Sequence, residues 1–141
     1  GVELDVLLVP VGGGGLIAGC TIAMQSLSPR TRVLGVQSER YPSMAIALGR
    51  RHAGAVPPVV PGGSTVAEGI GVARAGALTA QVLGELGVEV ALVPEARIEE
   101  ALALLLQIEK TLVEGAGAAG LGAMLALPGA LRGQRVGLVL S

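Results

Sequence analysis

The chain has 141 residues, 51% hydrophobic and 15% charged, so it is long enough and apolar enough to bury the core of one domain. A formal net charge of −1 and a single aromatic residue, Tyr41, offer nucleic acid neither a basic surface nor a stacking platform. The uncharged run 116–131 is shorter than the ~20 residues of a membrane span, which predicts a buried helix instead. The single cysteine, Cys20, excludes an internal disulfide framework and favours the cytoplasm.

Short apolar runs alternate with helix-like segments along the chain. The apolar runs predict strands buried on both faces of a sheet, at residues 5–10, 32–37, 88–94 and 134–141. Helical patterns fall at residues 14–27, 41–51, 76–87, 95–112 and 115–127. The prolines and glycines of residues 53–64 predict a loop. The alternation predicts an α/β fold with a parallel sheet and helices on both faces.

Four consecutive glycines, Gly12 to Gly15, separate the first predicted strand from the first predicted helix. Glycine in an ordered element costs roughly 0.5–1 kcal/mol relative to alanine, so this loop needs a physical reason. A strand, a glycine turn and a helix N-terminus together form an anion site, because unpaired amides and the helix dipole both favour negative charge. The pattern therefore predicts that a phosphate approaches the backbone here.

Three interpretations of this loop remain open from spacing alone. Gly13, Gly15 and Ala18 satisfy a loose dinucleotide fingerprint, with Glu39 placed where a ribose-binding acid could stand. The second interpretation is a smaller phosphorylated cofactor whose phosphate is wrapped by all four glycine amides. The third interpretation is a glycine turn that only permits close packing of the helix on the strand.

Six stretches in order resemble the threonine/serine dehydratase and serine racemase group of fold-type II pyridoxal-phosphate enzymes, which are similar in fold to the tryptophan synthase β chain. They are "PVGGGGLIAG", "VLGVQSE", "TVAEGIGVARAG", "VPEARIEEALALLL", "LVEGAGAAGLGAML" and the final "VLS". The resemblance extends over nearly the whole chain and implies pyridoxal 5'-phosphate as the cofactor. It also implies a role in amino-acid metabolism, including isoleucine biosynthesis.

The resemblance implies a set of site residues. The cofactor phosphate would be bound by backbone amides, and the cofactor ring would lie beside "AEGI" and accept a hydrogen bond at its nitrogen from the final serine. The implied cofactor-binding residues are Gly12, Gly13, Gly14, Gly15, Leu16, Gly69 and Ser141. The glutamate of "VEGAGA", Glu114, would be the catalytic residue, able to hold a hydrogen bond or move a proton.

The chain departs from the family in two respects. The Schiff-base lysine and the substrate-carboxylate loop of the family lie in an N-terminal segment that has no counterpart here, and the only lysine, Lys110, is expected in the last turn of a surface helix. Ser141 lacks the Gly-Gly-Asn that follows it in the family. We therefore expect residues 1–141 to be the C-terminal part of a larger catalytic region, incomplete as a fold and inactive alone.

Several other polar residues receive structural interpretations. Glu68 is expected to be a solvated loop residue, His52 a loop histidine beside two arginines, and Cys20 a packing residue. Some family members bind a divalent cation after the second strand. The matching positions here are Gln37, Tyr41 and Ser43, none of them acidic, so no metal is expected there.

The resemblance thus implies a pyridoxal-phosphate-dependent ammonia-lyase that eliminates the β-hydroxyl of threonine or serine to give a 2-oxo acid and ammonia. Racemisation on the same scaffold and a nicotinamide-binding Rossmann module are the alternatives, and a non-catalytic packing domain is the third. The expected partners are a small amino-acid substrate and, for the full-length protein, further copies of itself.

Overall fold

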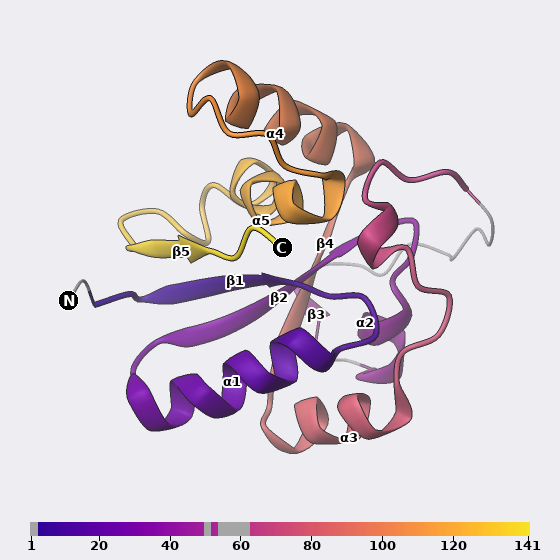
Figure 1. Ribbon diagram of the computed structural model, residues 1–141. Coiled ribbons are helices and arrows are strands. Elements are labelled where there is room, and N and C mark those ends of the chain that lie inside the picture. The colour runs from indigo at the N-terminus through magenta and orange to yellow at the C-terminus, as the bar shows by residue number, and fades with distance from the viewer. Residues whose placement is uncertain (1–2, 50–51, 54–62) are drawn as a thin grey trace.

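The computed structural model describes residues 3–49, 52–53 and 63–141 as a five-stranded parallel sheet with helices on both faces (Figure 1). The strands are β1 (Val6–Pro10), β2 (Arg32–Ser38), β3 (His52–Ala53), β4 (Glu89–Val93) and β5 (Val136–Leu138). Their order across the sheet is β3-β4-β2-β1-β5. The predicted α/β class and parallel sheet are therefore confirmed.

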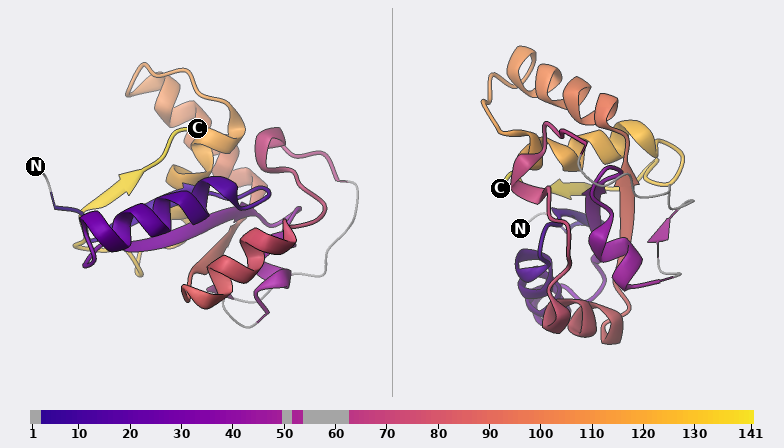
Figure 2. Two further views of the ribbon diagram at one scale, coloured as in Figure 1. Left: turned by 60° about the horizontal axis from the view of Figure 1, so that its bottom comes forward. Right: turned by 90° about the vertical axis from the view of Figure 1, so that its right-hand side faces the viewer.

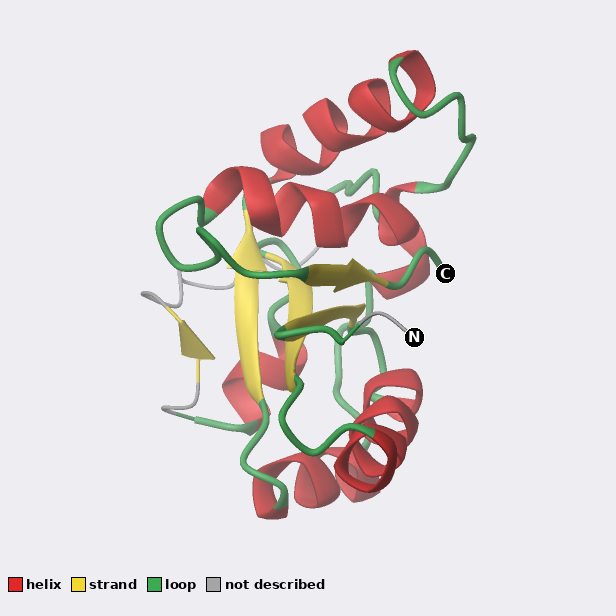
Figure 3. Ribbon diagram, turned by 90° about the vertical axis from the view of Figure 1, so that its left-hand side faces the viewer, coloured by secondary structure: helices red, strands yellow, loops and turns green. Residues whose placement is uncertain are grey.

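Two helical layers sandwich the sheet (Figures 2 and 3). One layer holds α1 (Gly15–Leu27), α2 (Ser43–Ala47) and α3 (Ala77–Glu85); the other holds α4 (Glu95–Gln107) and α5 (Gly115–Ala126). A short 3₁₀ helix, η1 (Glu68–Ile70), lies in the connection between β3 and α3. None of the helices within the described residues has the length and apolarity to cross a bilayer.

Alternate residues of β1 enter the two cores. Leu8 packs in the core beneath α4 and α5, whereas Val9 packs in the core that α1, α2 and α3 cover, and both side chains are fully buried. This is why β1 is apolar without interruption: successive side chains point to opposite faces, and both faces are covered. Gly35 of β2 is crowded by Ile17, Val11 and Val90, so that α1 packs directly on the strand.

Some predicted boundaries are wrong. The expected helix 95–112 stops at Gln107, and Lys110 lies beyond it with a φ of 55°, its Nζ donating to the carbonyl of Gln107 at 2.6 Å. The expected helix 41–51 is limited to the five residues of α2 among those described. The strand predicted at 134–141 shortens to β5 because only three of its residues pair with β1.

His52 was expected in a loop, but its backbone belongs to β3, which pairs with β4 at the edge of the sheet. The glycine- and proline-rich loop predicted at 53–64 falls largely on residues 54–62, which lie outside the described part of the chain. Three residues of that range are described: Ala53 ends β3, whereas Gly63 and Ser64 are in irregular structure.

β1 lies between two strands, β2 and β5, that are reached on opposite faces of the sheet. From β1 the chain proceeds to β2 through α1 on one face, while the last strand, β5, reaches the other side of β1 through α5 on the opposite face. In open α/β sheets, ligands bind at the carboxyl ends of the strands where the order reverses. The glycine loop of residues 12–15 stands directly at this point.

Candidate functional site

The glycine loop presents backbone amides without partners. The last sheet-like bond on this side is from the Val11 amide to the carbonyl of Val36, at 2.8 Å, and the first bond of α1 is from Ala18 to Gly14, at 3.1 Å. Within the described part of the chain, no acceptor pairs with the amides of residues 12–16. Unpaired donors at the positive end of a helix are suited to bind an anion.

Two of the four glycines leave an open approach to these amides. A Cβ built on Gly13 or on Gly15 would meet no heavy atom within 4 Å, and both residues are exposed. Leu16, the next residue, is 46% exposed at the start of α1. The loop therefore has free space where a phosphate oxygen could reach a backbone nitrogen.

Gly14 lacks a side chain for a different reason. Its φ is 94°, in the left-handed region that favours glycine, and a Cβ there would lie 2.5 Å from Met44 Cε and 2.8 Å from Thr79 Oγ1. The protein itself, and not an open approach, occupies that side of Gly14. Gly12 is also tight, since its Cβ would lie 3.1 Å from Val72 Cγ2 and 3.4 Å from the carbonyl oxygen of Gly69.

Thr79, a residue of α3, is hydrogen-bonded to the backbone of the glycine loop. Its hydroxyl lies 2.6 Å from the carbonyl oxygen of Gly13, to which it donates, and the amide of Gly76 donates to the same oxygen at 3.2 Å. A carbonyl oxygen facing an anion would repel it. Because the Gly13 carbonyl is directed to α3, the loop turns its donors rather than this acceptor to the open side.

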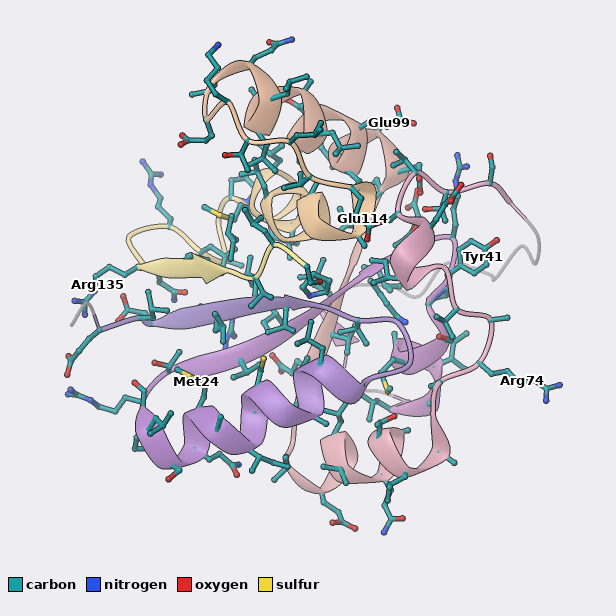
Figure 4. The ribbon with its side chains drawn as sticks, in the orientation of Figure 1. Met24, Tyr41, Arg74, Glu99, Glu114 and Arg135 are labelled. Atoms are coloured by element: carbon teal, nitrogen blue, oxygen red, sulfur yellow. The ribbon has the colours of Figure 1, made fainter. Side chains whose placement is uncertain are left out.

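Gly69 and Glu114 lie next to each other, and Gly69 is also next to Gly12. A Cβ on Gly69 would lie 2.5 Å from Glu114 Oε1, so the absent side chain makes room for the carboxylate. Glu114 is exposed and precedes α5 directly, with its carboxylate beside η1 in Figure 4. The structure thus brings the two predicted residues together and connects them to the glycine loop through Gly12.

Ser141 reaches the same edge of the sheet from β5. The Val139 amide donates to the carbonyl of Leu8, so β5 continues alongside β1 towards the glycine loop. The backbone of Ser141 packs on the first turn of α5, where a Cβ on Gly117 would be 3.2 Å from its carbonyl oxygen. The predicted residues 12–16, Gly69, Glu114 and Ser141 are hereafter the candidate site; their individual roles remain predictions.

The other singled-out residues lie outside this cluster. Glu68 is exposed and lines a cavity of about 240 Å³ with Tyr41, Ser64, Thr65 and Gly71. Cys20 is half-buried against the core under α1, as expected for a packing residue. Lys110 is exposed beyond the end of α4.

The positions compared with a cation site have other partners. Gln37 is fully buried, and its Oε1 accepts bonds from the amides of Met44 and Ala45 at 3.1 and 3.2 Å, so it caps α2. Its Nε2 donates to Ser43 Oγ, and the hydroxyl of Tyr41 donates to the carbonyl of Gly63. These side chains orient α2, which places Met44 under Gly14.

Sequence reasoning missed two residues of this region. Glu95 looked like an ordinary first-turn acid of a helix, but it is buried and accepts hydrogen bonds from Ser38 and Thr65, which are 57 and 30 residues away in the sequence. Thr79 gave no signal at all, and Gly13, to which it donates, is 66 residues away. No local pattern could connect residues at these separations.

A parallel sheet with a glycine loop at its switch point is typical of α/β proteins that bind phosphorylated ligands. The chain belongs to the pyridoxal-phosphate dependent enzyme family, whose model matches residues 1–141. This membership favours the smaller phosphorylated cofactor over the dinucleotide, and it confirms the resemblance to fold-type II enzymes.

Within this family, the chain is similar to proteins named threonine ammonia-lyase and threonine dehydratase. The chain is 40% identical to an L-threonine ammonia-lyase of Thermotoga maritima over 139 residues, which are 99% of this chain and 33% of that protein. It is 41% identical to the catabolic L-threonine dehydratase TdcB of Escherichia coli K12 over 123 residues, 87% of this chain and 36% of that protein. The chain therefore spans about a third of the length of these relatives.

Solved structures give the same result. The threonine deaminase of T.th. matches with a TM-score of 0.85 and 37% identity over 100% of this chain and 44% of that one. Maize serine racemase matches with a TM-score of 0.82 and 30% identity, over 99% of this chain and 43% of that one. The fold of this chain is thus shared by an enzyme named as a deaminase and an enzyme named as a racemase.

Proposed function

We propose that residues 1–141 form the phosphate-binding part and one wall of the active site of a pyridoxal-phosphate-dependent ammonia-lyase that acts on threonine or serine. The observation that carries the proposal is the glycine loop: unpaired amides at residues 12–16 with open space at Gly13 and Gly15. These residues fit a phosphate, because unpaired amides lie in a loop that has open space at Gly13 and Gly15. The relatives named threonine ammonia-lyase and threonine dehydratase supply the substrate class.

Each part of the candidate site has a role in this proposal. The amides of residues 12–16 bind the phosphate, and the positive end of α1 stabilises its charge. The Ser141 hydroxyl donates to the pyridine nitrogen, which leaves that nitrogen largely unprotonated. Gly69 leaves space for the Glu114 carboxylate, which holds or moves a proton beside the ring. When bound, pyridoxal phosphate supplies the electron sink that loss of the α-proton and of the β-hydroxyl requires.

The covalent attachment of the cofactor needs a lysine that this chain does not provide. Lys110 is the only lysine, and it lies beyond the end of α4 with its Nζ on the Gln107 carbonyl. We propose that the lysine and the substrate-carboxylate loop belong to another segment of a longer protein. The share of the relatives that the chain spans, 33% to 36%, supports this division.

Further properties of the longer protein belong to the same proposal. We place it in the cytoplasm, because a single cysteine fits a reducing compartment, and in amino-acid metabolism, including isoleucine biosynthesis. We expect it to be a homo-oligomer. Large apolar side chains such as Leu27, Leu78 and Leu112 are 73% to 85% exposed in this chain and would be covered by other protein.

The proposal is tested with the full-length protein. Purified protein should show the visible absorption of bound pyridoxal phosphate and should release 2-oxo acid and ammonia from threonine or serine. A second candidate reaction, racemisation, has support from the structural match to serine racemase; formation of D-serine without 2-oxo acid would favour it. Protein that binds no pyridoxal phosphate would contradict both.

A further inference from the structure

A buried carboxylate, that of Glu95, lies behind residues 65–70, the segment that carries Gly69 and forms one wall of the candidate site. Glu95 is 5% exposed and is the only acid or base among the buried described residues. Its Oε2 accepts a hydrogen bond from Ser38 Oγ at 3.1 Å and lies 3.8 Å from Nε of Arg40. A buried charge is costly unless it is paired and hydrogen-bonded, so these partners explain how it is tolerated but not what it is for.

The remaining partners of Glu95 all come from the segment that leads into η1. The Thr65 hydroxyl is 2.8 Å from Oε1 and 3.0 Å from Oε2, and the amide of Val66 donates to Oε1. Thr65 Oγ1 in turn accepts a bond from the amide of Ala67 at 3.1 Å. One carboxylate thus fixes three successive residues, and charge-assisted bonds of this kind are about twice as strong as neutral ones.

That segment forms the wall between the glycine loop and Glu114. Ala67 is fully buried, and the amide of Ile70 donates to its carbonyl, which closes η1. Gly69 then lies against both Gly12 and the Glu114 carboxylate. The backbone of Val66 is so close to Gly115 that no Cβ could stand between them, so a shift of Val66 is transmitted to the start of α5.

We infer that Glu95 is a positioning residue that fixes residues 65–70 and thereby places Gly69 and Glu114 at the cofactor. It joins the end of β2, the start of α4 and the wall of the candidate site in one hydrogen-bonded cluster. The inference rests on the proposed function, because the wall has this role only where pyridoxal phosphate is bound. Glu95 itself is buried, and its partners are Ser38, Arg40, Thr65 and Val66.

The test is hydrogen–deuterium exchange of the cofactor-free full-length protein, combined with titration of pyridoxal phosphate. In Glu95→Ala we expect the amides of residues 66–70 to exchange at least tenfold faster while those of β1 and β2 stay unchanged. The affinity for pyridoxal phosphate should fall at least tenfold, and the visible circular dichroism per bound cofactor should decrease. The matched control is Glu99→Ala, an exposed acid on the same helix, which should behave as wild type.

A second pair of variants covers the case in which Glu95→Ala does not fold. Thr65→Val removes the hydroxyl that bridges Glu95 and the Ala67 amide, and it should reproduce the faster exchange and the lower cofactor affinity of Glu95→Ala. Thr65→Ser keeps the hydroxyl and should show wild-type exchange and affinity. Equal acceleration of exchange in all strands, with wild-type cofactor affinity of the folded fraction, would overturn the inference, as would unchanged exchange at residues 66–70. A wild-type protein that binds no pyridoxal phosphate would contradict the proposed function instead, and the exchange data would still decide whether Glu95 holds the wall.

Discussion

At the scale of single residues, the four glycines of the loop are not equivalent. Gly14 has a φ of 94° and is enclosed by Met44 and Thr79, whereas Gly13 and Gly15 face open space. The sequence could predict a glycine loop, because its position between a strand and a helix is a local feature. It could not separate the packing glycine from the open ones, since Met44 and Thr79 come from α2 and α3.

We expect Gly14→Ala to lower the free energy of unfolding by more than ~1 kcal/mol, because a left-handed alanine costs ~1–2 kcal/mol and the methyl group would also collide with Met44. Gly19→Ala is the matched control: it lies within α1 with nothing near its Cβ, and alanine there should raise stability by up to ~1 kcal/mol. Urea unfolding of the full-length protein measures both. Equal stability of the two variants would refute the packing role of Gly14.

Ser141→Ala is expected to reduce activity more than stability. The hydroxyl would be lost as a donor to the pyridine nitrogen, a net effect of roughly 0.5–1.5 kcal/mol on cofactor binding. Ser26→Ala, at an exposed position of α1, is the control and should change neither property. Steady-state kinetics with a thermal melt separate the two effects, and wild-type activity of Ser141→Ala would remove this residue from the candidate site.

At the scale of elements, strands were easier to predict than helix ends. β1, β2 and β4 are buried over most of their length, so each contains an uninterrupted apolar run, at residues 6–10, 33–36 and 90–93. The end of α4 was misjudged because a lysine, and not a glycine, takes the positive φ after it. η1 escaped prediction because no local pattern defines it; Glu95 holds the residues before it, from a different element.

The start of β1 is tied to the start of β5 by one carboxylate. Asp5 Oδ2 accepts bonds from the amide of Arg135 at 2.7 Å and from its Nε at 3.4 Å. The backbone hydrogen bond, with the guanidinium second, lowers the pKa of Asp5 from its usual 3.8. A folded-state pKa below the unfolded one gives stability that is present above about pH 4 and is lost as the pH falls through the lowered pKa.

Asp5→Asn should therefore destabilise the full-length protein at pH 6, and progressively less as the pH falls through the lowered pKa of Asp5. The difference in unfolding midpoint between wild type and variant should shrink steadily as the pH falls below about 4. Glu99→Gln, an exposed acid on α4, serves as the control for a general change in charge. A difference that is independent of pH would show that the Asp5 carboxylate does not connect the two strands through its charge.

At the scale of the whole molecule, the chain carries the candidate site without the lysine that the proposed chemistry needs. Its two helical layers and parallel sheet bring residues 12–16, Gly69, Glu114 and Ser141 to one edge, although these positions are spread over the whole sequence. The only lysine, Lys110, lies beyond the end of α4 with its Nζ on the Gln107 carbonyl. The sequence predicted these residues as one site, and the strand order explains why they lie at one edge of the sheet.

Residues 1–141 alone should show no turnover of threonine or serine. The reason is the missing lysine, without which the cofactor cannot be attached for the usual reaction. The assay is 2-oxo acid formation with added pyridoxal phosphate, and the full-length protein is the positive control. Clear cofactor-dependent turnover by residues 1–141 would contradict the division of the site between two segments.

The central claim is that the open side of the glycine loop holds the cofactor phosphate, and Gly13→Val in the full-length protein tests it most directly. The new side chain meets no protein atom within 4 Å of its Cβ, so the fold should tolerate it, but it would occupy the approach to the amides. We predict at least a tenfold loss of affinity for pyridoxal phosphate with a near wild-type thermal melt, and unchanged affinity in Gly19→Val. A folded Gly13→Val protein that binds pyridoxal phosphate as tightly as wild type would contradict the account.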